Sequence, residues 1–63
     1  MTMIETEIWR DGPAVLTRRG SVYRFDNNVD EPIYGRCATD FLERDEAGII
    51  PSSALWAINN QEL

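Results

Sequence analysis

The shortness of the chain constrains its fold more than any other feature. A domain of 63 residues buries only about 60% of the surface that its unfolded chain exposes, so burial barely offsets the entropy lost on ordering. Small proteins often add disulfides or a metal, but this chain has one cysteine, Cys37, and no histidine. A disulfide within the chain is therefore excluded, and almost no ligands remain for zinc. We expect a single domain over residues 1–63 with no cofactor, stabilised further only by a second copy of the chain or another protein.

Alternating apolar and polar residues dominate the first part of the chain and predict short strands. In an extended segment over residues 4–9, strict alternation places Trp9 on the side of Glu5 and Glu7, opposite the two isoleucines of the segment. Two further strands and two turns are predicted, the strands at 14–17 and 21–25 and the turns at 11–13 and 18–20. Strands this short, with turns this close together, indicate an antiparallel meander.

The middle of the chain fits two structures. Residues 26–32 are polar and rich in turn-forming residues, which predicts an exposed loop. Residues 33–44 then alternate as a strand would, but they also form an apolar helical stripe through Phe41. We favour a strand here, because Gly35 and the β-branched Thr39 weaken a long helix.

The C-terminal part contains several short predicted elements. They are a turn at 45–48, a strand at Ile49-Ile50 ended by Pro51, one helical turn at 52–55, and a frayed tail at 59–63. Residues 56–58 fit either a last strand that closes the sheet or an extension of the helical turn.

The segment from Arg18 to Ile58 resembles the later part of SH3-like small β-barrels. The matching pieces are Arg18-Arg19-Gly20, the loop 27–32, the long segment 33–42, the hairpin 43–48 and Gly48-Ile49-Ile50-Pro51-Ser52. The resemblance implies an all-β or β-rich fold, a small antiparallel barrel of about five strands with one short helical turn. An α+β fold, with a three-stranded meander and a C-terminal helix, is the alternative. The polyproline-binding rings of SH3 domains are missing, since Ile33 and Ala54 stand where aromatic residues are usual.

The residues of this chain predict a protein that is not an enzyme. An activated cysteine needs a nearby base or cationic setting, and the sequence has neither histidine nor lysine, so Cys37 is expected in the core. Neighbouring acids such as Asp40 and Glu43 are expected to be solvated or ion-paired, because so small a domain has little room for a cleft that would raise a pKa.

The charge of the chain limits its partners. A net charge of −5 repels phosphate, so direct binding of nucleic acid is not expected. No apolar run approaches the roughly 20 residues that a membrane span needs. The lone thiol and the absence of an export signal predict a cytoplasmic protein, in the host cytoplasm if a phage encodes it.

The residues predicted to bind a partner are acids and exposed aromatic rings. They are Trp9, Tyr34, Trp56, Asp26, Asp30, Glu31, Asp45 and Glu46. In size and charge the chain is similar to small acidic proteins of phages and mobile elements that inhibit host nucleases or CRISPR complexes. We therefore expect an inhibitor or regulator of this type, anti-CRISPR-like or otherwise directed against the host, that blocks the basic groove of a nucleic-acid-handling protein. The alternative is an SH3-like structural or assembly module that homo-oligomerises, or docks into a larger complex, through Trp9 and Trp56.

Overall fold

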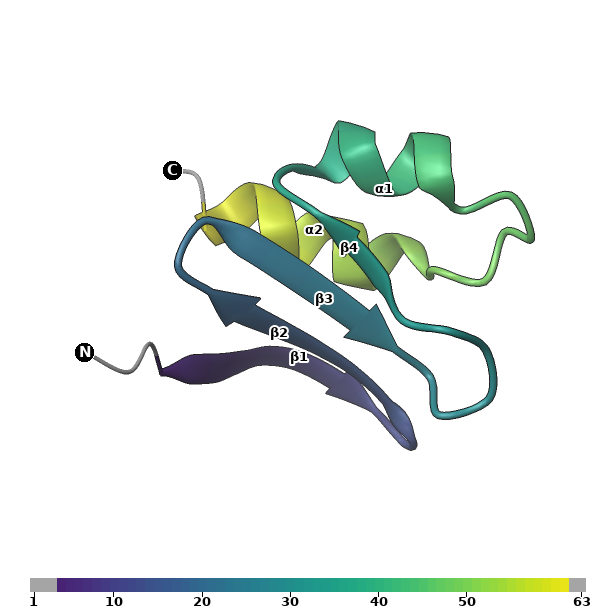
Figure 1. Cartoon of the computed structure of the whole chain (residues 1–63), viewed down its shortest axis with the longest axis horizontal. Coiled ribbons are helices and arrows are strands. Elements are labelled where there is room, and N and C mark those ends of the chain that lie inside the picture. The colour runs from purple at the N-terminus through teal and green to yellow at the C-terminus, as the bar shows by residue number, and fades with distance from the viewer. Residues whose placement is uncertain (1–3, 62–63) are drawn as a thin grey trace.

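A computed structural model describes residues 4–61 as one antiparallel sheet with two helices (Figure 1). The elements are β1 (Glu5–Asp11), β2 (Ala14–Arg19), β3 (Val22–Asp26), β4 (Ile33–Gly35), α1 (Ala38–Arg44) and α2 (Ser52–Gln61). The strands lie in the order β1-β2-β3-β4, and each pairs antiparallel with the next along the chain. The predicted β-rich antiparallel meander is therefore confirmed, as an open sheet of four strands accompanied by two helices.

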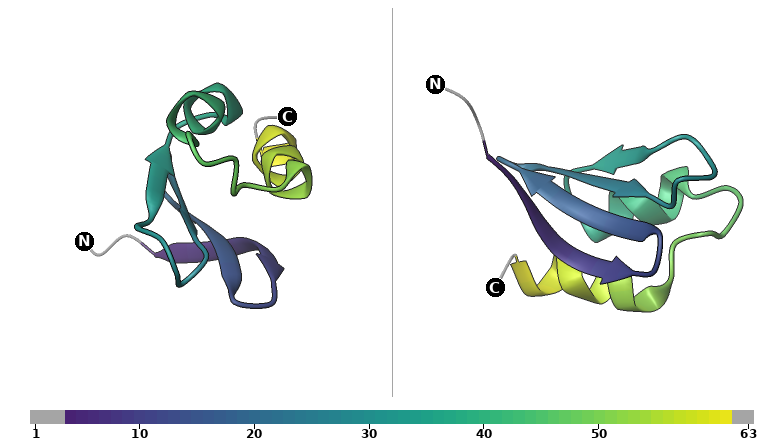
Figure 2. Two further views of the ribbon diagram at one scale, coloured as in Figure 1. Left: turned by 90° about the vertical axis from the view of Figure 1, so that its right-hand side faces the viewer. Right: turned by 90° about the horizontal axis from the view of Figure 1, so that it is seen from below.

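Both helices lie on one face of the sheet and leave the other face uncovered (Figure 2). The core between helices and sheet consists of six buried side chains, namely Leu16, Tyr23, Phe25, Phe41, Ala54 and Ile58. In the strands, these residues follow the period-2 alternation of a half-buried sheet. In α2, the two core residues are four positions apart and therefore share one face of the helix.

A β-bulge in β1 changes the face to which Trp9 belongs. Glu7 lies opposite Thr17 but Trp9 lies opposite Leu16, so Ile8 is an extra residue in the ladder. Such an insertion exchanges the two faces for every residue that follows it. The Trp9 ring is consequently half-buried on the covered face, with its centroid 6.1 Å from that of Phe25. The prediction that it shares a face with the two glutamates of β1 is wrong.

The strand predicted over residues 33–44 is also wrong beyond Gly35, where β4 ends and α1 soon begins. The chain turns because the carboxylate of Asp40 accepts a hydrogen bond from the backbone N–H of Arg36, at 2.9 Å. The helical stripe then places Phe41 fully inside the core. Burial of a phenyl ring outweighs the weak preference of single residues against helix.

The strand predicted at Ile49-Ile50 is a loop in the structure. The backbone N–H groups of these residues donate to the two carboxylate oxygens of Asp45, at 2.8 and 2.9 Å. They are therefore not free to join a sheet ladder. Instead, the segment leads into α2, where the carbonyl of Pro51 accepts hydrogen bonds from the first turn.

The C-terminal helical turn continues as a helix of ten residues. Residues 56–58 thus extend the turn rather than form a last strand. Of the tail predicted to fray, residues 59–61 belong to α2 and residues 62–63 lie outside the described part of the chain. Within residues 4–61, neither helix is long and apolar enough to cross a bilayer.

Replacement of Gly35 by alanine is expected to separate α1 from β4. A Cβ atom at this position would lie 2.9 Å from Cβ of Asp40 and 3.1 Å from the ring of Phe41, closer than carbon atoms normally approach. We expect Gly35→Ala to lower the free energy of unfolding by about 1–3 kcal/mol, measured by urea denaturation. Thr39→Ala, at an exposed position of α1, is the control and should change it by less than about 0.5 kcal/mol. Equal stability of the two variants would show that α1 does not pack on Gly35.

Candidate functional site

Three connections gather at one end of the long axis of the molecule, which measures 35 Å against 24 and 18 Å for the others. They are the β1–β2 turn, the β3–β4 loop and the α1–α2 loop, at the right in Figure 1 and in the right-hand view of Figure 2. A hydrogen bond from Nδ2 of Asn28 to the carbonyl of Pro13 joins the first two directly. The β2–β3 turn, which follows Arg18 and Arg19, lies at the opposite end.

Four exposed carboxylates lie in these connections or directly beside them. We call Asp11, Asp30, Glu31 and Glu46 the acidic end; all four are exposed. Like charges held together on a small molecule create a local negative potential that steers positively charged partners. The fold therefore places acids that lie up to 35 positions apart in the sequence, from 11 to 46, in connections at the same end of the molecule.

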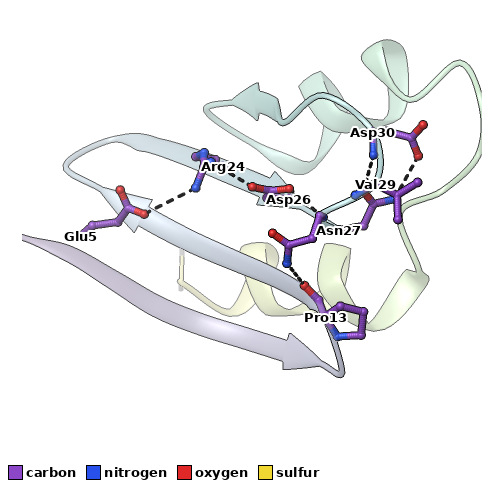
Figure 3. A network of polar contacts seen from close by, with 8 residues as sticks. Glu5, Pro13, Arg24, Asp26, Asn27, Val29 and Asp30 are labelled. Atoms are coloured by element: carbon purple, nitrogen blue, oxygen red, sulfur yellow. Dashed lines mark hydrogen bonds and ion pairs between the residues drawn. The ribbon is translucent and has the colours of Figure 1, made fainter.

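Internal hydrogen bonds give the β3–β4 loop a defined shape (Figure 3). The Oδ1 atom of Asn27 accepts from the backbone N–H groups of Val29 and Asp30, at 3.0 and 2.9 Å. Its Nδ2 atom donates to the carboxylate of Asp30 at 3.1 Å. Asn28 adopts a φ of 64°, a left-handed conformation that asparagine tolerates better than most residues. The loop thus presents Asp30 and Glu31 from an ordered backbone.

Two of the acids predicted to bind a partner accept hydrogen bonds from other groups of the protein. Asp26 accepts from Nη2 of Arg24 at 2.9 Å and from the backbone N–H of Asn28 at 2.8 Å, and only 17% of its side chain is exposed. Asp45 follows α1 and holds the next loop through its two carboxylate oxygens. Both acids shape the acidic end, while Asp30, Glu31 and Glu46 are the predicted acids that remain exposed there.

The aromatic residues predicted to bind a partner do not form one surface. Tyr34 is 51% exposed on β4 and lies opposite Arg24, on the uncovered face of the sheet. Trp56 is 67% exposed on α2, which covers the other face. Trp9 packs against the core. The three rings therefore have three separate environments.

The uncovered face carries a hollow of about 460 Å³ that the sequence reasoning missed. It is lined by Glu5, Thr17, Arg19, Val22, Arg24 and Tyr34. These residues come from all four strands, and their common signal in the sequence is alternation, because each lies opposite to the core-facing positions of its strand. Glu5, Thr17 and Arg24 come from predicted strands, whereas Arg19 was predicted in the turn at 18–20 and in the structure is the last residue of β2.

Most charges on the uncovered face are paired. Arg24 lies between Asp26, at 2.9 Å, and Glu5, at 4.0 Å. Arg10 donates to Glu7 at 2.6 Å. This hydrogen bond, together with the negative charge of Glu7, raises the pKa of Arg10 above its ordinary value.

Cys37, which we expected in the core, is not fully buried. Cys37 is half-buried and occupies the N-cap position of α1 in an extended conformation. Within residues 4–61, no three histidine, cysteine, aspartate or glutamate side chains lie close enough together to hold a metal ion.

Comparisons with known proteins give no relative on which to base a function. No protein-family model matches the chain, and no curated protein or solved structure is significantly similar to it.

Proposed function

We propose that this protein is a non-catalytic inhibitor or regulator that inserts its acidic end into a basic groove of a nucleic-acid-handling protein. The observation that supports this proposal is the gathering of Asp11, Asp30, Glu31 and Glu46 by three connections at one end of the molecule. A groove that grips nucleic acid presents arginine and lysine side chains to phosphates. Carboxylates on a narrow, ordered end can occupy the same positions and exclude the nucleic acid.

Charge gives this mode of binding its speed and its specificity. The net charge of −5 attracts a basic partner from a distance and repels acidic ones. The ordered β3–β4 loop lowers the entropy lost on binding, because its acids are already positioned. An inhibitor of phage or mobile-element origin, anti-CRISPR-like in its action, would use both properties against a host protein.

A pair of double variants with the same change in charge tests the proposal. Glu31→Gln with Glu46→Gln removes two charges from the acidic end, and Glu5→Gln with Glu7→Gln removes two from the sheet face. With candidate basic partners in a pull-down at stepwise salt concentrations, we expect the first variant to bind at least tenfold more weakly, a loss of about 1.4 kcal/mol. The second should bind within about twofold of the wild type, because exposed ion pairs contribute little. Equal losses for both variants would show that net charge, and not the acidic end, controls binding.

A second candidate function is assembly, which the exposure of Trp56 favours. An indole ring that is 67% exposed is a typical anchor of protein interfaces. In this case the chain would act as an SH3-like structural module that self-associates or docks through α2. Size-exclusion chromatography with light scattering should then show an oligomer that dissociates in Trp56→Ala. If the wild-type protein is a monomer at all concentrations, it does not self-associate through this ring.

A further inference from the structure

We propose that the outer face of α2 binds a second copy of this chain, in an antiparallel dimer with two-fold symmetry. We define this outer face by the exposed residues Ser52, Ser53, Trp56, Asn59 and Asn60. The helix lies along one side of the molecule, and in both views of Figure 2 its outer side is free of the other described elements. The inference rests on the second candidate function, self-association through α2, and adds the occupant and its orientation.

The outer face of α2 combines one large aromatic ring with neutral polar side chains. Trp56 is 67% exposed in the middle of the helix, and the four polar residues lie one turn before or after it. None of the ten residues of α2 is charged, whereas charged residues make up 27% of the chain. Depletion of charge around an aromatic ring distinguishes the core of a protein interface from the remaining surface. This face therefore has the composition of an interface.

Symmetry selects a second copy of the chain as the occupant. In a two-fold interface the same surface lies on both sides, so a charged side chain close to the axis meets charges of its own sign. Serine and asparagine side chains each donate and accept hydrogen bonds, so a surface made of them can pair with the same surface of another copy. The outer face of α2 consists of these two residue types around one ring, and it is therefore complementary to itself.

The charge of the chain points to the same surface. With a net charge of −5, two copies repel each other. Every other described element of more than three residues carries charged side chains, so α2 is the surface on which two copies meet with the least repulsion. A different protein would recognise so acidic a chain through its carboxylates, and α2 offers none.

The position of the acidic end determines the orientation of the two copies. The helix begins beside the α1–α2 loop, at the acidic end, and runs toward the opposite end of the molecule (Figure 1). Parallel packing would bring the two acidic ends together. Antiparallel packing separates them, because the molecule is 35 Å long and exposed charges are screened beyond about 8 Å at physiological salt. The dimer then presents one acidic end in each of two opposite directions.

A two-fold axis at Trp56 fixes which residues meet. The two indole rings pack on each other, while Ser52, four positions before the ring, faces Asn60, four positions after it, in the second copy. This pair occurs twice in the dimer. A helix of ten residues is about 15 Å long, so the contact is smaller than a standard interface. We therefore expect a dimer that forms at high micromolar concentration.

Sedimentation equilibrium over a range of protein concentrations tests the dimer and its interface. For the wild type we expect monomers and dimers without larger species, because a two-fold contact is closed. Trp56→Ala should raise the dissociation constant at least tenfold. The matched control is Tyr34→Ala, which removes a ring that is 51% exposed on the other face of the sheet and should leave the dissociation constant unchanged. Since both rings are exposed, the urea midpoints of both variants should stay close to that of the wild type.

Two double variants that differ at one position test the orientation. Ser52→Lys with Asn60→Glu places opposite charges against each other in an antiparallel dimer and should dimerise at least as well as the wild type. Ser52→Lys with Asn60→Lys places like charges there and should weaken dimerisation about tenfold, about threefold for each of the two pairs. This second variant brings the net charge closer to zero, so the loss would be due to local repulsion and not to the charge of the whole molecule.

The outcomes separate this inference from the function on which it rests. If the wild type stays monomeric up to millimolar concentration, both self-association and this dimer are wrong. A dimer that Trp56→Ala does not weaken, or that both double variants weaken equally, would leave self-association in place but overturn the antiparallel contact through α2. Species larger than a dimer would overturn its two-fold symmetry.

Discussion

Phe41→Ala is expected to remove most of the free energy of unfolding of this protein. The ring of Phe41 is fully buried between α1 and the sheet, and removal of a buried phenyl group costs about 3–5 kcal/mol. A chain of 63 residues has a total free energy of unfolding of only roughly 3–9 kcal/mol. The loss therefore consumes most of the stability.

Circular dichroism with urea denaturation measures this effect, and the next residue provides a matched control. Leu42 belongs to the same helix but is 64% exposed, so Leu42→Ala should change the free energy of unfolding by less than about 0.5 kcal/mol. If residues 33–44 formed a strand, alternation would still place these two residues on opposite faces, but α1 would be missing. The helical signal in the spectrum of Leu42→Ala would then come from α2 alone and would be smaller than two helices of seven and ten residues give.

Asp45→Ala is expected to destabilise the fold by about 2–3 kcal/mol. The substitution removes the acceptor for two backbone N–H groups, those of Ile49 and Ile50. Both residues are half-buried against the core, and each buried donor left without a partner costs about 1–3 kcal/mol. The α1–α2 loop would lose the contact that directs the chain into α2.

The neighbouring acid makes a direct comparison for this prediction. Glu46 is exposed and its side chain makes no hydrogen bond with the described residues, so Glu46→Ala should leave the thermal midpoint nearly unchanged. Asp45→Asn keeps one oxygen acceptor and should give an intermediate result. If Asp45→Ala were as stable as Glu46→Ala, the loop would not depend on this carboxylate.

The first half of the fold could be predicted from the sequence because its signals are local. Alternation around Tyr23 and Phe25, with turns at Gly12 and Gly20, identifies three strands and their order. Both glycines have positive φ values, 60° and 61°, which is the conformation that such turns require. Two strands joined by a tight turn pair with each other. The order of the strands in the sheet therefore follows from the short distances between them in the sequence.

The errors arose where a tertiary contact decided the structure. The bulge at Ile8 leaves no local signal in the sequence, yet it moves Trp9 to the covered face. The helix α1 forms in spite of Gly35, because the glycine is needed for close approach of the Phe41 ring. Neither contact can be inferred from the periodicity of a single segment.

The candidate site was predictable in composition but not in the roles of its members. The sequence shows which residues are acidic, and loops on a small sheet gather at its ends. It does not show that Asp26 and Asp45 bind backbone groups while Glu31 and Glu46 remain exposed. That distinction depends on the backbone around each carboxylate, and it divides the predicted residues into those that shape the acidic end and those that are available to a partner.

The dependence of association rate on salt is the most direct test of how this protein works. For a partner captured in the pull-down, surface plasmon resonance at low and high ionic strength separates association from dissociation. We expect the association rate constant to fall at least about tenfold between 50 and 300 mM salt while dissociation changes little, since steering by charge acts on the approach. Glu31→Gln with Glu46→Gln should reduce this salt dependence, and Glu5→Gln with Glu7→Gln should preserve it. An association rate that is the same at both salt concentrations would contradict binding through the acidic end.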